Sequence, residues 1–286
     1  MTSINRLKKD QHAFKMLTGI TVEKFDEIFV KLKPIYEAWH LNGLLQRKRK
    51  RAPRSGNDFT LELEDRLLML LIYYRTYVTH VFLGFLFHMD DSNVCRNINP
   101  LQPLLAKVFK IPERRIELSE DEIADLFFDG TEQPTNRPKR KQKKWYSGKK
   151  KRHTIKHQIA TTKLKKKGKR TKVRIKAVSK AFCGKTHDKE MYVRTRTTSP
   201  PKTPGYGDKG YQGTALTTPH KKPKGASLTK AQKEWNSIHS SLRIVVEHGI
   251  GKMKIWRMAS DRYRNKRNHH TVMMKNIAGL QNMMFA

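Results

Sequence analysis

The sequence predicts an α/β protein in which a helical region precedes a sheet-containing region. Two observations carry this prediction. Apolar residues recur with a spacing near 3.6 before about residue 115, whereas several later segments alternate between apolar and polar residues. The charge also changes along the chain, because 19 of the 25 acidic residues lie at or before Glu132 and none lies between residues 133 and 187. We therefore expect two domains, at residues 1–115 and 116–286.

The chain is strongly basic for its length. Its 286 residues include 61 Lys and Arg against 25 Asp and Glu, which gives a formal net charge of +36. Such a charge opposes compact folding by self-repulsion, and nucleic acid is the polyanion that most often balances it. An anionic membrane is the competing partner, but we find no run of about 18 apolar residues and no apolar signal core at the start. Nucleic acid is therefore the expected partner.

The two cysteines indicate where the protein functions. Cys95 and Cys183 lie far apart in the sequence, and neither belongs to a zinc-binding pattern. This usage argues against a disulfide framework or a zinc finger and favours a reducing compartment. We therefore expect a cytoplasmic protein.

The first region has the pattern of a series of helices. Residues 21–39 carry apolar side chains at helical spacing. A second helix is predicted within residues 59–77, with Thr60 as its cap and Leu61 as its first residue. Between these segments, residues 46–57 are basic and contain proline and glycine, which predicts a linker.

Residues 79–107 predict two short helices joined by a tight turn. The first is expected at 79–88, and the second begins at Asp91 or Ser92. This arrangement is typical of the DNA-binding helix-turn-helix, although a plain αα-hairpin fits the pattern equally well. The residues expected to contact DNA from the start of the second helix are Ser92, Asn93 and Arg96.

The second region begins with segments that have the pattern of strands. An apolar run ends in Asp129, and residues 153–162 and 171–182 then alternate between apolar and polar side chains. The sequence KKKGKR at 165–170 predicts a hairpin turn between the last two segments. Three strands in succession predict the antiparallel start of a mixed sheet.

The end of the chain combines a turn-rich segment with helices. Residues 200–213 are rich in proline and glycine and place Asp208 after a short extended segment. Residues 227–258 form the longest helical candidate, with mostly apolar residues at heptad-like spacing, and Glu247 lies off this apolar stripe. A last helix is expected at 269–284.

Three carboxylates are candidates for chemistry. Taken singly, Asp129 and Asp208 are typical of turns, and Glu247 is typical of a solvated helix face or of an ion pair with Arg243 or Lys254. Taken as a set, carboxylates on separate elements suit hard divalent cations, which prefer oxygen ligands. Two such ions can activate water and stabilise the leaving oxygen in phosphodiester cleavage.

The three carboxylates lie within longer motifs. These are FFDGTEQPTNRPKRKQKKWYSGKKKRHTIKHQ, GDKGYQG, KKPKG, LTKAQKEWN and RIVVEHGIGKMKIWRM. Together they resemble DDE-type insertion-sequence transposases, and the nearest group is the insertion-sequence-five family, which is related to the Harbinger elements of eukaryotes. The resemblance covers nearly the whole chain from about residue 60.

This resemblance implies a fold, a site and an activity. The fold is an RNase H-like mixed sheet preceded by an α-helical helix-turn-helix domain. Asp129 on the first strand, Asp208 after the fourth and Glu247 on a following helix would be the catalytic residues and would bind two Mg²⁺ ions, or Mn²⁺ as a substitute. Between residues 189 and 207 the chain departs from the family, because it is rich in Arg, Thr and Pro where a clearer helix and an apolar strand are expected.

The implied activity is that of a bacterial, nucleoid-associated transposase. Such a protein binds the terminal inverted repeats of its insertion sequence as a homodimer or larger assembly, cleaves the DNA strands and transfers them to a target. The alternatives are a decayed or domesticated basic DNA-binding protein without catalysis and an endonuclease of the same fold.

The run from residue 139 to 152, which contains no acid, is the expected contact with DNA phosphates. Within it, Trp145 and Tyr146 are placed to stack on unpaired bases or to pack beneath the sheet. Glu132 and His187 lie near the carboxylates in the sequence and fit turn and structural roles better than catalytic ones. The predicted DNA contacts of this region are Lys139, Arg140, Lys141, Lys143, Lys144, Trp145, Lys149, Lys150, Lys151, Arg152, Arg243 and Lys254.

Overall fold

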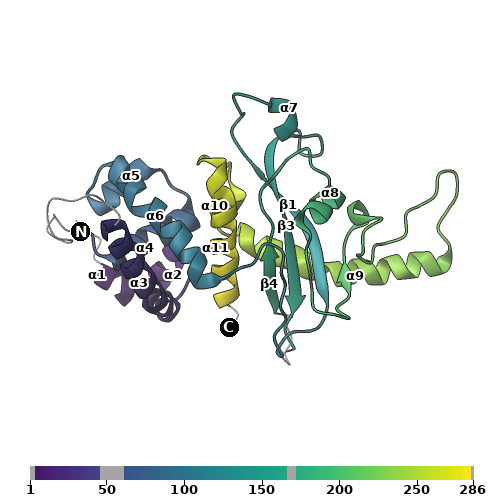
Figure 1. Ribbon diagram of the computed structural model, residues 1–286, viewed down its shortest axis with the longest axis horizontal. Helices are drawn as coiled ribbons and strands as arrows, with labels where there is room; N and C mark the ends of the chain where they lie inside the picture. Colours follow the sequence, from purple (N-terminus) through teal and green to yellow (C-terminus); the bar gives the residue numbers. More distant parts are fainter. Residues whose placement is uncertain (1–3, 46–60, 166–171, 285–286) are drawn as a thin grey trace. The chain divides into compact units, whose positions relative to one another are not determined.

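The chain folds into two compact units, whose elements Figure 1 shows in the computed structural model. The residues that the structure describes are 4–45, 61–165 and 172–284. The first unit holds Met1–Lys110 together with Trp256–Met258, and the second holds Ile111–Ile255 together with Ala259–Ala286. Within the described residues, no helix combines the length and the apolar character needed to cross a membrane.

The first unit is helical, as the apolar periodicity predicts. Its helices are α1 (Ile4–Lys9), α2 (Gln11–Thr18), α3 (Val22–Leu45), α4 (Leu63–Thr76), α5 (His80–Phe87) and α6 (Asp91–Phe109). Helix α2 begins where the Asp10 carboxylate accepts a hydrogen bond from the Ala13 N–H at 2.9 Å, and it ends at Gly19, whose φ is +80°. Helix α4 lies at the centre of the unit, because every side chain from Arg66 to Tyr74 is buried.

Helix α4 starts later than the sequence predicts. It begins at Leu63, so the predicted start at Leu61 is wrong. The reason is local, because Glu62 has an extended backbone with ψ of 160° and therefore stands outside the helix. The predicted Thr60 cap and the predicted linker at 46–57 lie outside the described residues.

Helices α5 and α6 form the helix pair predicted for residues 79–107. The Thr79 hydroxyl caps α5, and His88 ends it with a φ of +54°, so the chain reverses within three residues. Gly84 permits this turn, since a Cβ there would collide with the carbonyl oxygen of Met89. The tight turn inferred from the sequence is therefore present.

The second unit is built on a six-stranded mixed sheet. Its strands are β1 (Leu126–Pro134), β2 (Tyr146–Ser147), β3 (Arg152–Lys163), β4 (Val173–Val178), β5 (Phe182–Cys183) and β6 (Gly205–Tyr206). Strand β3 pairs antiparallel with β1, β4, β2 and β5, whereas β6 pairs parallel with β1. The structure therefore contains the predicted antiparallel succession, as β1, β3 and β4. Most of the turn expected at 165–170 lies outside the described residues.

Strand β3 is buried on both faces, although its alternating sequence predicts burial of one. Every residue from Thr154 to Thr162 is buried, including Lys156 and Gln158. Helices cover the sheet, because α9 (Lys230–Lys254) packs on β1, β3 and β4, while α8 (Asp188–Thr195) packs on β3 and α11 (His270–Met283) on β4. The polar residues of β3 therefore point into a second packed layer and not into solvent.

Helix α9 is shorter than the predicted segment 227–258. It begins at a capping box formed by Thr229 and Gln232 and ends at Lys254. Its buried residues lie mostly in its second half, and Ile238 in the first half is 54 % exposed. Figure 1 shows why, since the first half of α9 extends beyond the strands. The predicted apolar stripe is therefore buried only where the helix crosses the sheet.

The segment at 189–207, which departs from the family pattern, still forms regular structure. Residues Asp188–Thr195 are helical despite their polar composition, and Gly205–Tyr206 form the short strand β6. The helix is anchored by Met191, its one fully buried side chain, and the strand by its pairing with β1. The segment therefore leads through α8 and β6 to Asp208.

Candidate active site

Strand β1 places Asp129 directly after a buried apolar run. The side chain of Asp129 is 20 % exposed, and its Oδ1 accepts a hydrogen bond from the Gly130 N–H at 2.7 Å. Burial raises the pKa of Asp129 to about 6, Arg243 and the Gly130 N–H oppose this shift, and the nearby carboxylates of Asp208 and Asp188 add to it. Asp129 is therefore a carboxylate whose charge is only partly compensated by its surroundings.

The pairing of β6 with β1 brings Asp208 beside Asp129. The two strands run parallel, with Phe127 opposite Tyr206. Because Asp129 and Asp208 each lie two residues further along, they lie near one another where β6 ends. Asp208 then caps the short 3₁₀ helix η1 (Lys209–Tyr211), since its Oδ1 accepts a hydrogen bond from the Gly210 N–H at 2.8 Å. Asp208 therefore has the turn role that the sequence suggests and also lies beside Asp129.

Glu247 reaches the same place from helix α9. Its neighbour one turn earlier, Arg243, lies with one guanidinium nitrogen 3.7 Å from Glu247 Oε1 and 3.5 Å from Asp129 Oδ2. The Glu247 side chain is 57 % exposed, so it is far less constrained than Asp129. Arg243 thus links the helix carboxylate to the strand carboxylate.

The three predicted carboxylates are neighbours but do not converge on one point. Within the described ranges, no three Asp, Glu, His or Cys side chains are close enough together to hold one metal ion. Asp129 and Asp208 influence one another directly, whereas Glu247 is joined to Asp129 through Arg243. The arrangement is a loose carboxylate cluster with a cation inside it.

Asp188, one of the six acids after Glu132, belongs to the same neighbourhood. Its Oδ1 lies 3.1 Å from Lys156 Nζ, and the same ammonium lies 3.4 Å from Glu132 Oε1. Lys156 also donates a hydrogen bond to the Thr186 carbonyl oxygen at 2.9 Å. One signal for Asp188 was available, because it is the first acid after the acid-free run. Glu132 is also more than a turn residue, because its side chain is buried in this ion-pair network.

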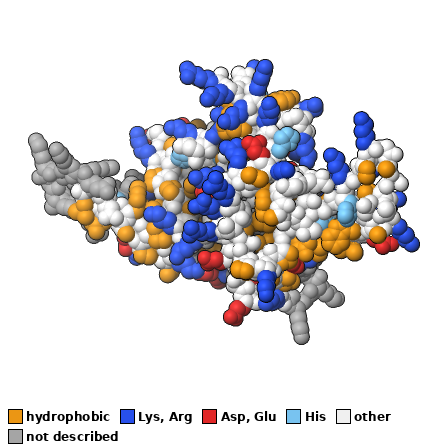
Figure 2. All heavy atoms as spheres, turned by 45° about the vertical axis from the view of Figure 1, so that its right-hand side comes forward, with side chains coloured by type: hydrophobic (Ala, Val, Ile, Leu, Met, Phe, Trp, Pro, Cys, Tyr) orange, Lys and Arg blue, Asp and Glu red, His pale blue; other side chains and the backbone are white. Residues whose placement is uncertain are grey.

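The basic run brings exposed cations to one side of this site, where Lys143 and Lys149 share a cavity with Glu132 and Asp188. The short helix α7 (Gln142–Trp145) and strand β2 lie in it, and its predicted Lys and Arg contacts are all exposed. Trp145 is partly buried beneath the Arg267 guanidinium, 4.7 Å from its ring centre, which favours a packing role. Tyr146 is 42 % exposed and stays available for stacking. Figure 2 shows that blue Lys and Arg side chains outnumber red acidic ones on the face in view.

Lys254 lies near the carboxylates, at the end of α9. Partial burial and the nearby Lys150 lower its pKa, while Asp129 and Glu132 act in the opposite direction. Its neighbours are thus both the basic run and the acids.

In the first unit, Ser92 and Arg96 are exposed on α6 and Asn93 is half-buried.

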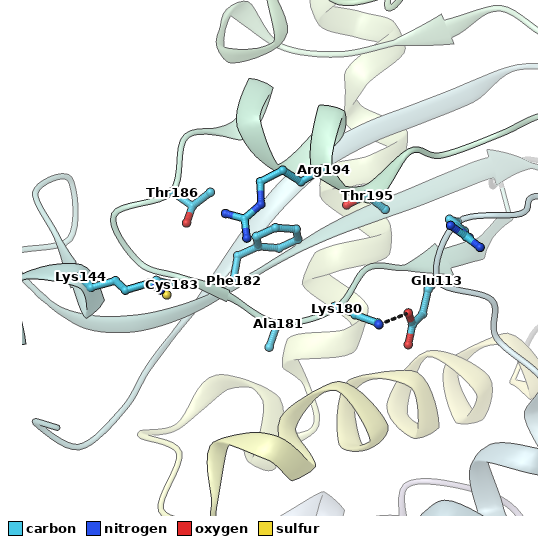
Figure 3. A pocket seen from close by; sticks show the side chains of 10 residues that line it. Glu113, Lys144, Lys180, Ala181, Phe182, Cys183, Thr186, Arg194 and Thr195 are labelled. Atoms are coloured by element: carbon cyan, nitrogen blue, oxygen red, sulfur yellow. Dashed lines mark ion pairs between the residues drawn. The ribbon is translucent and has the colours of Figure 1, made fainter. Parts of the chain in front are cut away.

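One cavity lies apart from the predicted carboxylates. It has a volume of about 540 Å³, and Figure 3 shows Lys144, Lys180 and Arg194 around the Phe182 ring. Arg194 stacks on Phe182 at 5.2 Å, and Glu113 is paired with Lys180 at 3.9 Å. A second cavity, of about 490 Å³, is lined by Lys143, Tyr146, Lys149 and Lys185 and reaches Asp188 and Glu132. Both cavities are predominantly cationic.

Comparisons with known proteins place this architecture in a family. Residues 128–282 match the family described as DDE superfamily endonuclease, and residues 59–111 match the family described as the helix-turn-helix of DDE superfamily endonuclease. The chain therefore belongs to the DDE superfamily endonucleases and carries their helix-turn-helix domain in front of the catalytic region. The resemblance to DDE-type insertion-sequence transposases is confirmed.

Two relatives narrow the assignment to transposases of insertion sequences. The chain is 31 % identical to the protein proposed as the transposase of insertion sequence element IS702 from Microchaete diplosiphon, over 96 % of this chain and 94 % of the relative. It is 30 % identical to the one proposed for element IS112 from Streptomyces albus G, over 84 % of this chain and 87 % of that relative. No solved structure matches the chain.

Proposed function

We propose that this protein is a DNA transposase that binds the terminal inverted repeats of its insertion sequence, cleaves the DNA at each end and transfers the strands to a target. Because two ends must be held together, it acts as a homodimer or larger assembly, on the DNA of the bacterial nucleoid. The observation that carries the catalytic part is the parallel register of β6 and β1, which brings Asp208 beside Asp129. Family membership supports the same activity.

The sheet order supports an RNase H-like core. Such a core, as the family resemblance implies it, has its first acid on the first strand and its second acid after the fourth. Strands β1, β3 and β4 form an antiparallel succession, and the short strand β6 pairs parallel with β1 on the side away from β3. Asp129 on β1 and Asp208 after β6 are consistent with the implied order, and α9 carries Glu247 across the same sheet.

The carboxylates fit a divalent cation. Their donor atoms are all carboxylate oxygens, the ligands that Mg²⁺ and Mn²⁺ prefer. The raised pKa of Asp129 shows a buried carboxylate that a nearby cation would stabilise. We propose that Asp129, Asp208 and Glu247 hold two Mg²⁺ ions, with Mn²⁺ as a substitute. When bound, these ions would lower the pKa of an attacking water and polarise the scissile phosphate.

The chain's own cations position the DNA. Arg243 lies between Asp129 and Glu247 and is placed to donate hydrogen bonds to the phosphate being cleaved. Lys254 lies between the acids and the basic run and extends the cationic surface. The exposed cations of residues 139–152 and those lining the cavity of Figure 3 would contact DNA phosphates further from the reacting phosphate. Ser92, Asn93 and Arg96 on α6 would contact the terminal repeat.

Cleavage of a terminal-repeat duplex in Mg²⁺ tests the site. Each of the variants Asp129→Asn, Asp208→Asn and Glu247→Gln is expected to cleave more slowly than the wild type. The fall in cleavage rate should exceed the roughly 10–100-fold loss that is typical when a residue supporting a metal ligand is replaced. Glu234→Gln is the matched control, because Glu234 is an exposed acid on the same helix as Glu247. Wild-type rates in all three variants would contradict the assignment.

The same assay separates the transposase from its alternatives. A basic DNA-binding protein without catalysis would bind the duplex with a steep salt dependence, would be indifferent to EDTA and would never nick it. An endonuclease of the same fold would cut the duplex without joining its ends to a target. Joining of cut ends to a supercoiled plasmid is the result that the transposase alone predicts.

A further inference from the structure

Two glycines close to the catalytic aspartates have no room for a side chain, because a carboxylate lies against each of them. Gly130 follows Asp129, and a Cβ on it would lie 2.7 Å from Asp188 Oδ1. Gly210 lies two residues after Asp208, and a Cβ on it would lie 2.9 Å from Asp208 Oδ1 and 3.0 Å from Asp188 Oδ2. Neither glycine has a positive φ, so the backbone does not require glycine at these positions. The carboxylate of Asp188 fills the space that both side chains would need.

Asp188 approaches the site from the face of the sheet opposite Asp129. Successive side chains of a strand point to opposite faces, so Asp129 faces α9 and Arg243, while Gly130 faces α8 and Asp188. The Asp188 carboxylate thus stands between β1 at Gly130 and the loop that carries Asp208. Its carboxylate lies against both segments at residues close to the catalytic acids.

The position of Asp188 is fixed by a buried ion-pair network. Lys156 on β3 lies 3.1 Å from Asp188 Oδ1 and 3.4 Å from Glu132 Oε1, and the side chains of Lys156 and Glu132 are each only 9 % exposed. Glu132 is held in turn by the Thr154 hydroxyl at 2.9 Å. One cation shared by two carboxylates leaves a net negative charge behind the catalytic pair, so the network adds to the negative field that attracts a cation.

The hydroxyl of Tyr211 is another polar group that is buried in this neighbourhood. Tyr211 is fully buried, and its hydroxyl has no hydrogen-bond partner among the described residues. Burial raises its pKa well above the ordinary value, and the next causes are the charges of Asp188, Asp129 and Asp208. The phenol therefore experiences the charges of all three aspartates. Asp188 shares its surroundings with the two catalytic aspartates, whereas Glu190, the other acid of α8, is exposed and paired with Arg194.

We propose that Asp188 is a positioning residue of the catalytic site: its carboxylate sets the spacing between the Asp129 strand and the Asp208 loop, and its charge strengthens the binding of the catalytic cation. The proposal deepens the proposed function and rests on it for the identity of the cation site. It assigns Gly130 and Gly210 the role of making room for Asp188, and Lys156 the role of holding it.

A double-mutant cycle tests the contact without reference to catalysis. Gly130→Ala in the full chain should lower the melting temperature, because its Cβ meets the Asp188 carboxylate. In an Asp188→Ala background the same substitution should cost much less, since the carboxylate is gone. Gly148→Ala is the control, because a Cβ there meets nothing within 4 Å. Equal costs of Gly130→Ala in both backgrounds would overturn the contact.

Cation binding tests the role of the charge. Asp188→Asn keeps the shape of the side chain and removes its charge, so it should weaken Mn²⁺ binding by roughly tenfold, as followed by electron paramagnetic resonance on the DNA-free protein. Glu190→Gln, which removes an exposed acid from the same helix, should leave Mn²⁺ binding unchanged. Wild-type affinity in Asp188→Asn would overturn the proposed charge effect.

These readouts distinguish the two possible failures. If Asp188→Asn weakens Mn²⁺ binding but the wild-type protein cleaves no terminal-repeat duplex, the proposed function fails and the role of Asp188 in the cation site stands. If the duplex is cleaved in an Asp129-dependent way and neither the cycle nor the Mn²⁺ affinity responds to Asp188, the positioning role fails alone.

Discussion

Asp129 and Glu247 reach the same site from very different supports. Asp129 lies on a strand paired on both sides, next to a buried apolar run, and its side chain is 20 % exposed. Glu247 stands on one turn of a long helix, with its side chain 57 % exposed and Arg243 as its ion-pair partner. The strand acid is therefore fixed and only partly compensated, whereas the helix acid is mobile and weakly held.

This difference indicates a division of roles between the acids. Asp129 and Asp208 are placed by the register of two strands, so their separation changes little without unfolding the sheet. Glu247 can change rotamer at little cost, because it is solvated and its ion pair is 3.7 Å long. We therefore expect the two aspartates to form the permanent part of the cation site and Glu247 to complete it.

The largest effect should separate the aspartates from Glu247 in cation binding. Asp208→Asn should weaken Mn²⁺ binding by more than about 100-fold, because it removes a proposed ligand that the strand register holds in place, whereas Glu247→Gln should weaken it by roughly tenfold. Both variants should nevertheless lose cleavage. Calorimetric titration of the DNA-free protein measures the first effect, and equal losses of affinity in the two variants would contradict the division of roles.

A second prediction uses the raised pKa of Asp129, about 6 against an ordinary value of 3.8. A carboxyl whose pKa is raised on folding stabilises the protein at pH values below its unfolded pKa and loses that contribution as pH rises through the folded pKa. Asp129→Asn should therefore raise the free energy of unfolding at pH 8 by up to about 3 kcal/mol in metal-free buffer.

The gain from Asp129→Asn should disappear as the pH falls from about 6 toward 4, because both proteins are then neutral at this position. Urea unfolding at several pH values measures the difference. Glu247→Gln, which removes the exposed acid of the same proposed site, is the matched comparison. A pH-independent difference for Asp129→Asn would show that its charge is well compensated in the fold.

The sequence predicted the strands of the sheet better than it predicted what surrounds the proposed acids. The apolar run that ends in Asp129 forms β1, and the two alternating segments form the antiparallel strands β3 and β4. The parallel pairing of β6 was beyond reach, because a two-residue strand in a proline- and glycine-rich segment has no periodicity to detect. The family resemblance implies that Asp208 follows the fourth strand, but only the register of β6 with β1 shows that Asp208 lies beside Asp129.

Lys156 and its buried ion pair with Asp188 show what the sequence could not predict. Lys156 sits at a polar position of an alternating strand, which predicts exposure, yet its side chain is only 9 % exposed because α8 covers that face. Helix α8 itself is short and polar, so nothing in its composition marks it as a packed element. Charged residues buried by a covering layer become apparent only when the layer is known.

Arg243 provides a third and smaller test of the comparison. Its guanidinium is the main group that keeps the pKa of Asp129 from rising further, so Arg243→Gln should move the acid limb of the cleavage profile to higher pH. Loss of a charged hydrogen-bond donor to phosphate should also lower kcat/KM by about tenfold. Lys233→Gln, an exposed cation on the same helix, should do neither. If the pH profile of cleavage does not shift, Arg243 does not control the pKa of Asp129.

The smallest effect should come from moving α9 itself. Gly249 lies two residues after Glu247 and faces the sheet, where a Cβ would lie 2.9 Å from Thr161 Cγ2. Gly249→Ala should gain about 1 kcal/mol in helix propensity and lose a similar amount where the helix is pushed from β3, so stability should change little. Cleavage should fall by a few-fold, because Glu247 is displaced with the helix while Asp129 stays in place.

Gly251 supplies the control on the same turn of α9. A Cβ there meets nothing within 4 Å, so Gly251→Ala should gain the helix propensity of up to about 1 kcal/mol and leave cleavage unchanged. If the two variants behave alike, Glu247 adjusts by its own rotamer and the helix position is unimportant. If only Gly249→Ala impairs cleavage, the mobile acid still depends on how closely its helix approaches the sheet that fixes the other two.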